Sequence, residues 1–197
     1  MPVQSERQNN FFNVCKDCKD SCCRNARPPI NSKRKKIIET YLKKHKIPIK
    51  NPFVQASYVF LREDAEGYCI FYDKTTMKCL VHPVKPETCV AGPVTFDINM
   101  PHQKIGWFLK KEKICALAGM LYKNEGNLEK HLTSAKKEIL NLLHGLNSED
   151  LSAILKIEEP ETFKIDEDKI DDNVANKLNI KRKQSCKTSS VSLEKRI

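Results

Sequence analysis

The cysteines of this chain are gathered in one stretch, and their spacing constrains the fold more than any other feature. Eight of them form a C-x2-C-x3-C-C start, three further positions at ten-residue intervals, and a closing one: Cys15, Cys18, Cys22, Cys23, Cys69, Cys79, Cys89 and Cys115. A ninth, Cys186, lies apart in a polar segment. Eight thiols make two sets of four, the usual ligand number of a tetrahedral zinc site or an iron–sulfur cluster. The spacing therefore predicts a metal-binding cysteine cluster with these eight residues as ligands.

The surroundings of the cysteines favour metal binding over disulfides. No apolar run approaches the ~20 residues of a membrane-spanning helix, and residues 1–14 hold no apolar signal-peptide region. We therefore expect a cytoplasmic protein without a membrane span, and thiols stay reduced in that compartment. The net charge of +10 suits an anionic partner, either nucleic acid, an acidic protein or a membrane surface, although charge alone does not assign a function.

Apolar periodicity predicts three helices. A helix near 33–46 has one apolar face, and Asn31 or Ser32 can cap its start. A longer helix near 125–146 carries a stripe of aliphatic residues at steps of three and four. A short helix over 149–156 follows it.

Strand signals are confined to short segments. Runs of strand formers at 58–61, 68–72 and 77–81 are separated by turns, and predict a small antiparallel β-meander with cysteines at strand ends. Prolines predict an irregular stretch over 83–93, and a further strand is expected at 105–109. Turns at strand ends allow thiolates to converge on one metal.

The C-terminal part loses periodicity. Residues 161–172 are acidic and residues 177–196 are basic and rich in Ser and Lys, so a tail with at most a helical turn is expected. The boundaries predicted are a flexible N-terminus at 1–11, a cysteine-cluster metal-binding domain at 12–157 and a polar charged tail at 158–197.

The fold class predicted is α+β. A small cysteine-tethered β-meander and loops surround the metal, helices near 33–46 and 125–146 pack around them, and a disordered basic C-terminal tail follows. A core this short of strands would gain much of its stability from the metal.

Further residues accompany the cysteines in a defined order. The chain reads Cys69-Ile70-Phe71, and then Cys79, His82, Lys85-Pro86, Cys89 and Pro93. With this combination, over about residues 12–120, the chain resembles the CxxCxxCC cysteine-cluster proteins, which are called YkgJ-like and described as zinc- or iron-chelating. The resemblance implies that the eight clustered cysteines are its metal ligands. Relatives of that family include iron–sulfur oxidoreductases and a flagellin lysine methylase.

The chain departs from the family pattern at two places. Three residues, Lys19, Asp20 and Ser21, separate the second cysteine from the cysteine pair, where the family has two. Lys85 stands where the family usually has arginine, so a planar bidentate group is replaced by a point charge.

Other polar residues have simpler interpretations. His82 can be a ligand, but we favour a packing or hydrogen-bonding role. Lys85 and Glu87 flank Cys89 and can steady thiolate charge or contact a partner. The basic run Lys33–Lys36 is interpreted as a solvated face rather than a contact surface.

The functional hypothesis is an iron–sulfur (for example 4Fe–4S) or zinc/iron protein in electron transfer, cluster handling or metal delivery. One alternative is a zinc-stabilised interaction module that binds protein or nucleic acid, with a protein partner favoured and nucleic acid not. A second is a protein-lysine methylase-like enzyme, by analogy with the flagellin relative. The sequence has no Gly-rich phosphate loop, H-E-x-x-H motif or nucleophile elbow, so no catalytic residue and no organic-cofactor site are identified. We favour a protein that is not an enzyme.

Overall fold

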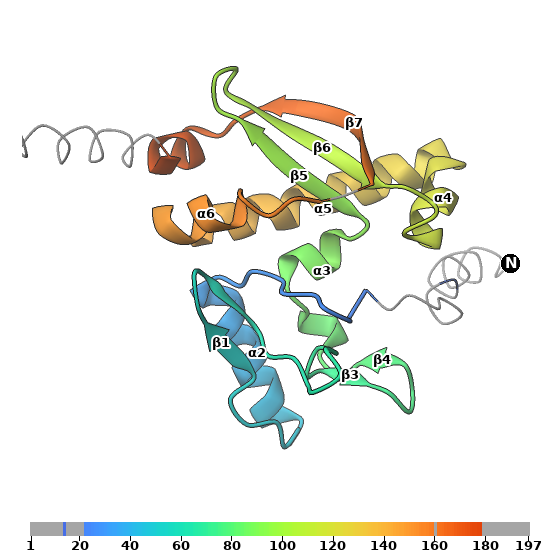
Figure 1. Ribbon diagram of the computed structural model, residues 1–197, viewed down its shortest axis with the longest axis vertical. Helices are drawn as coiled ribbons and strands as arrows, with labels where there is room; N and C mark the ends of the chain where they lie inside the picture. The colour runs from blue at the N-terminus through green and yellow to red at the C-terminus, as the bar shows by residue number, and fades with distance from the viewer. Residues whose placement is uncertain (1–13, 15–21, 160, 179–197) are drawn as a thin grey trace, which may run out of the picture.

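The computed structural model describes residues 14, 22–159 and 161–178 and arranges them in two lobes (Figure 1). We call residues 22–91 the cysteine lobe and residues 92–178 the sheet lobe. Each lobe has a hydrophobic cluster, and Tyr58, Phe60 and Ala91 of the cysteine lobe join that of the sheet lobe. Helices and small antiparallel sheets occur in both, which confirms the predicted α+β class.

The cysteine lobe begins with the predicted first helix, which is present as α2 (Ser32–Lys44). Asn31 caps it, because its side chain accepts a hydrogen bond of 2.8 Å from the backbone N–H of Arg34. Ile38 and Leu42 are buried one helical turn apart and face the lobe's core. Beside α2 lie the antiparallel strands β1 (Phe53–Gln55) and β2 (Val59–Leu61).

The predicted β-meander is present only in part. The strands β3 (Tyr72–Asp73) and β4 (Lys78–Cys79) pair as a minimal hairpin, but β2 pairs with β1 rather than with the next strand. The run at 68–72 is largely irregular because Tyr68 and Cys69 make isolated bridges to Arg24 and Glu63. A 3-10 turn η2 (His82–Val84) and the short helix α3 (Glu87–Ala91) follow.

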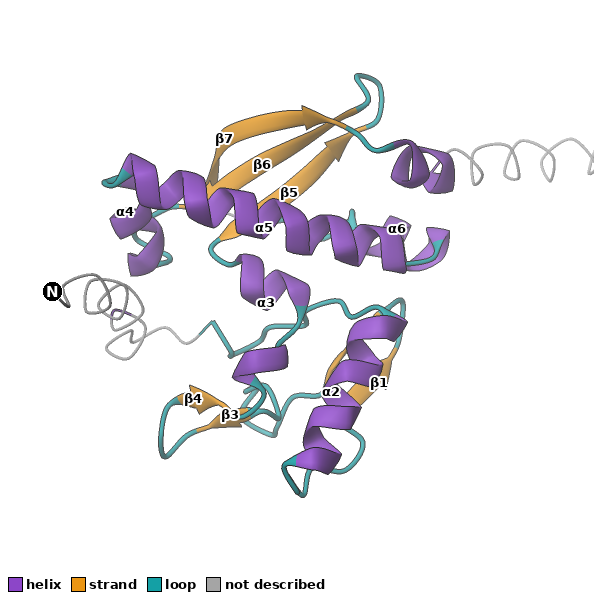
Figure 2. Ribbon diagram, turned by 180° about the vertical axis from the view of Figure 1, so that it is seen from behind, coloured by secondary structure: helices purple, strands orange, loops and turns teal. Residues whose placement is uncertain are grey.

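The sheet lobe is built on three antiparallel strands in the order β5-β6-β7. These strands are β5 (Val94–Asn99), β6 (Lys104–Lys110) and β7 (Thr162–Lys169). The helices are α4 (Ala116–Tyr122), α5 (Glu125–Gly145) and α6 (Ser148–Ile154). Figure 2 shows α5 crossing the sheet, and its buried residues join Trp107 of β6 in one core.

The predicted helix at 125–146 packs on α3 of the cysteine lobe as well as on the three-stranded sheet, and its apolar stripe joins the core that β5 and β6 line. One expectation for this half of the chain was wrong. Residues 162–169, predicted to be tail, form the edge strand β7, and residues 172–178 are helical. In β7, Phe163 and Ile165 pack against the core, and this alternation was obscured by the surrounding acidic residues.

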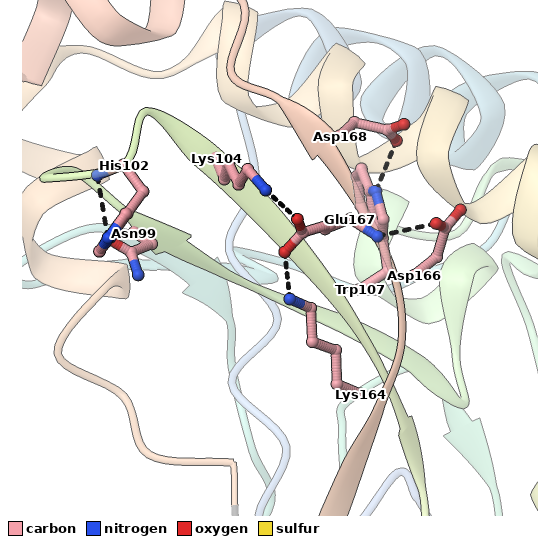
Figure 3. A network of polar contacts seen from close by, with 8 residues as sticks. All are labelled: Asn99, His102, Lys104, Trp107, Lys164, Asp166, Glu167 and Asp168. Carbon is pink, nitrogen blue, oxygen red and sulfur yellow. Dashed lines mark hydrogen bonds and ion pairs between the residues drawn. The ribbon is translucent and has the colours of Figure 1, made fainter.

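The acidic residues of β7 contact polar groups of β6 and Lys164 of β7 itself (Figure 3). The ammonium groups of Lys104 and Lys164 both contact the carboxylate of Glu167. The indole N–H of Trp107 donates to Asp168 Oδ2 at 2.7 Å. The segment is therefore neutralised locally, which allows a strongly acidic stretch to serve as a strand.

The lobes are joined by a buried polar cluster at the start of α2. The Asn31 amide donates to Glu87 Oε1 at 3.1 Å and to the Asn141 carbonyl of α5 at 3.2 Å. Arg34 lies 3.3 Å from Glu87 and 2.6 Å from Glu138 of α5. Glu87 is 2% exposed, and its burial raises the pKa of its carboxyl above the usual value. Sequence proximity had linked Glu87 to Cys89, whereas its side chain ties α3 to α2 and lies in the junction.

Residues 1–13, which hold the expected flexible N-terminus, and residues 179–197, which hold most of the basic tail, lie outside the described residues. In the part that is described, no helix is long and apolar enough to cross a membrane.

Candidate metal centre

Backbone hydrogen bonds bring three of the candidate ligands together. The N–H of Cys69 donates to the carbonyl of Cys23 at 2.7 Å, so the segment that carries Cys22 and Cys23 lies against the segment that carries Cys69. The N–H of Tyr72 then donates to the carbonyl of Cys69 at 2.8 Å, which turns the chain into β3. Segments that are distant in sequence therefore meet at these thiols.

The remaining two thiols of the group come from the hairpin and from α3. Cys79 pairs with Tyr72 in the β3–β4 register, and it packs with Cys23 and Cys69 in the cysteine-lobe cluster. Cys89 lies in the middle of α3, which begins after Pro86. Cys89 keeps exposed surface although burial raises the pKa of its thiol, so protein surrounds this side chain while one side stays open.

Five thiols share one electrostatic environment. A hydrogen bond from the Cys23 thiol lowers the pKa of Cys22 to about 6, and the same contact raises the pKa of Cys23. Burial raises the pKa of Cys69 to about 11 and raises the pKa values of Cys79 and Cys89. The charges of the neighbouring thiolates raise them further. The charge of the Cys22 thiolate therefore opposes the ionisation of the other four thiols, so the five lie close together.

This environment fits a soft metal ion or cluster. Thiolates that repel one another become stable together when a cation lies between them, and soft thiolates prefer zinc, copper(I) and iron–sulfur clusters. The ammonium groups of Lys85 and Lys110 lower the pKa of Cys22, so they favour its thiolate form. The donor chemistry and the surrounding charge both match the predicted kind of site.

Not every predicted ligand can be placed in this group. Cys15 and Cys18 lie outside the described residues, and so does Cys186, which was predicted to be separate. Cys115 precedes α4 and packs against the sheet-lobe core. Within residues 14, 22–159 and 161–178, no set of three or more His, Cys, Asp or Glu side chains has an arrangement ready to hold a metal ion. The first two cysteines of the sequence cluster, Cys15 and Cys18, are therefore not part of the group described here.

His82 lies next to the hairpin rather than inside the thiol group. It opens η2 and is exposed, while partial burial and the charge of Lys85 lower the pKa of its imidazole. The sequence interpretation favoured a packing or hydrogen-bonding role for His82 over a ligand role.

Two charged residues near the thiols were missed by sequence reasoning. Lys110 ends β6 in the other lobe, and its charge reaches Cys22. Glu63 is bridged to Cys69 through the backbone, and its charge raises the pKa of that thiol. Neither lies within a cysteine motif, so only the tertiary fold reveals them.

In this chain, short paired strands and helices bring thiols from separate segments close together. This arrangement is that of a cysteine-cluster protein. The chain belongs to the CxxCxxCC family: the family model, described as a "Putative zinc- or iron-chelating domain", matches residues 14–116. This membership supports a metal-binding role. The matched region contains the whole cysteine lobe, β5, β6 and Cys115, whereas α5 and β7 follow it. No curated protein and no solved structure matches the chain.

Proposed function

We propose that this chain binds an iron–sulfur cluster or zinc or iron ions through clustered thiolates, and acts in electron transfer, cluster handling or metal delivery. The proposed ligands are the eight clustered cysteines of the sequence: Cys15, Cys18, Cys22, Cys23, Cys69, Cys79, Cys89 and Cys115. The observation that carries the proposal is the convergence of five of these thiols from separate chain segments.

The absence of a disulfide at these thiols supports metal chelation rather than cross-linking. Within the described residues, Cys22, Cys69, Cys79, Cys89 and Cys115 are in no disulfide, although several of these thiols lie close together. Reduced thiols at this density suit a reducing compartment such as the cytoplasm, which is where we place the protein.

The exposure of the group favours transfer over a purely structural role. Cys22 and Cys89 are exposed, whereas Cys69 is buried. A structural zinc site is closed by its four protein ligands. A group with an open side allows a partner protein to approach the metal, as exchange of electrons or ions requires. An iron–sulfur cluster held here would supply one-electron chemistry.

Elemental analysis with an absorption spectrum, on protein purified without oxygen, tests this proposal. Brown protein with stoichiometric iron and sulfide would identify an iron–sulfur cluster. Colourless protein with stoichiometric zinc would identify a zinc site and exclude the proposed role in electron transfer. Full-length protein that binds neither metal would overturn the proposal.

Serine variants test the ligand set. Cys69→Ser and Cys89→Ser are expected to lose most of the metal, and Cys186→Ser is the matched control that keeps it. Retention of full metal by both Cys69→Ser and Cys89→Ser would contradict the assignment. Cys115→Ser decides whether the cysteine that packs against the sheet-lobe core is a ligand: the proposed set of eight predicts that it too loses metal.

A further inference from the structure

The solvent-facing side of α2 carries a row of lysines. Its exposed residues recur at steps of three and four, and so lie on the face opposite the buried Ile38 and Leu42. They are Ser32, Lys33, Lys36, Ile37, Thr40, Lys43 and Lys44. We call the four lysines of this set the lysine face. It spans about 16 Å along the helix, given a rise of 1.5 Å per residue.

The cations of the lysine face differ from most of those elsewhere because their ammonium groups make no ion pair, although Glu39 lies one helical turn from Lys36 and from Lys43. Within the described part of the chain, no ion pair involves Lys33, Lys36, Lys43 or Lys44. The lysines of the sheet lobe, by contrast, repeatedly contact acids. Those contacts join, for example, Lys111 to Glu161 and Lys123 to Glu112. The excess positive charge is therefore concentrated on this side of the cysteine lobe.

Helix stability does not account for this placement. The first turn of α2 contains no acidic residue. Lysines at a helix N-terminus oppose the macrodipole and cost a few tenths of a kcal/mol each. The dipole and the ammonium groups of Lys33 and Lys36 instead add to one positive potential. The exposed residues Lys46 and Lys50 extend it beyond the end of the helix.

We propose that the lysine face binds the phosphate backbone of a double-stranded nucleic acid without reading its sequence. A duplex carries one negative charge per about 1.7 Å of its axis when both strands are counted, so a length of about 16 Å carries roughly ten phosphate charges. The row offers ammonium groups, which contact phosphates as point charges. The exposed set contains no residue suited to bidentate recognition of a base.

Other polyanionic partners fit this face less well. Binding of single strands uses exposed aromatic rings on which bases stack; the exposed residues of α2 include none, and the ring of His45, which follows α2, already packs on Tyr41 at 4.1 Å between centroids. Helices that lie in a membrane surface insert an apolar face, whereas the apolar face of α2 is buried in its own lobe. A regular, dense and rigid line of charge is the partner that matches best. This inference does not depend on the proposed metal chemistry.

Fluorescence anisotropy with a labelled 20-base-pair duplex, at a series of salt concentrations, tests the proposal on the full-length, metal-loaded protein. The test variant is K33Q/K36Q/K43Q/K44Q. Its matched control is K74Q/K111Q/K113Q/K123Q, which removes the same number of charges from exposed, acid-paired lysines outside α2. Because exposed ion pairs contribute little to stability, the control should stay folded.

The lysine-face variant is expected to weaken duplex binding at least tenfold. It should also reduce the slope of log K against log salt by about 3–4, since each lost phosphate contact removes about 0.9. The control should change the slope by less than about 1. The double variant K36Q/K43Q, expected to reduce the slope by about 2, keeps the test valid if the fourfold variant folds poorly.

Three results would overturn the proposal. Equal losses in the test and control variants would show that net charge alone drives binding. Unchanged binding in the lysine-face variants would place the contact elsewhere in the chain. Binding to vesicles of anionic phospholipid that is tighter than binding to duplex, and is lost in the lysine-face variant, would assign the face to a membrane instead.

Discussion

The cysteine lobe and the sheet lobe differ in how much stability their own secondary structure and packing can supply. The sheet lobe has three adjacent strands of six to eight residues and a 21-residue helix packed on them. The cysteine lobe has two separate pairs of strands, each strand only two or three residues long. An isolated two-stranded pair is marginally stable at best in water.

The cores show the same difference. Trp107, Leu109 and Leu142 are fully buried between the sheet and α5. In the cysteine lobe, the buried set is small and includes the thiol of Cys69 beside Phe71 and Val81. The sheet lobe therefore has the core of an ordinary small domain. In the cysteine lobe, thiols take positions that apolar side chains would occupy in such a core. From this difference we expect metal binding and folding to be coupled in the cysteine lobe.

Removal of the metal gives the largest effect that this comparison predicts. A strong chelator should unfold the cysteine lobe while leaving the sheet lobe largely intact, because binding free energies of structural metals are on the order of 10 kcal/mol. Hydrogen exchange measured by mass spectrometry should show lost protection in α2 and the β3–β4 hairpin. Protection in β5, β6 and α5 should persist.

The sheet-lobe peptides are the internal control for this experiment. Equal loss of protection in both lobes would show that the metal stabilises the chain as a whole. No loss in the cysteine lobe would show that its short strands and α2 are sufficient without metal.

Substitution in the sheet-lobe core tests the converse. Trp107→Ala should lower the free energy of unfolding by about 3–5 kcal/mol, because it removes a fully buried aromatic ring and leaves a cavity. Metal content at low temperature should stay close to that of the unaltered protein, since the five thiols that converge lie in the other lobe. Thermal denaturation and elemental analysis measure the two quantities.

The paired variant is Phe71→Ala in the cysteine-lobe core. It removes a ring that is just as buried, but it should lower metal content as well as stability. Similar metal loss in both variants would remove the distinction between the lobes.

The junction between the lobes gives a smaller effect. Asn31→Ala should cost about 2–3 kcal/mol, since it removes the cap of α2 and also the amide that contacts buried Glu87. Asn124→Ala is the matched control: this asparagine caps α5 in the same way, but its side chain is exposed, so a cost of about 1 kcal/mol is expected. Equal costs, measured by denaturant unfolding, would show that the contact to Glu87 contributes nothing.

The sequence predicted the elements whose signal is local. Both main helices begin and end within two residues of their predicted bounds, because apolar periodicity and an asparagine cap or a terminal glycine mark them. β7 could not be found in this way. Its acidic residues become compatible with a strand only when Lys104 and Lys136, which are distant in sequence, lie beside them.

The site was predictable in chemistry but not in arrangement. Spacing identified the cysteines, and four of the eight come from the cluster at 15–23, of which only Cys22 and Cys23 can be described. The contact between Cys23 and Cys69 depends on backbone pairing of irregular segments, which leaves no periodic pattern. The influence of Lys110 likewise depends on how the end of β6 reaches the other lobe.

The smallest effect predicted is a pH dependence at the contact between α5 and α3. His131 donates from Nε2 to the carbonyl of Ala91 at 3.0 Å, and burial lowers the pKa of its imidazole below the usual value. The unfolded chain therefore takes up this proton more readily than the folded chain. Stability from this residue is fully present above the unfolded pKa of about 6.5, and is lost as the pH falls through the folded value. His131→Gln, which keeps a donor for Ala91, should make the decrease in Tm between about pH 7 and about pH 5 shallower. The exposed His102→Gln should leave it unchanged. An equally steep decrease in His131→Gln would show that acid sensitivity arises elsewhere, and would leave the α5–α3 contact without a role in it.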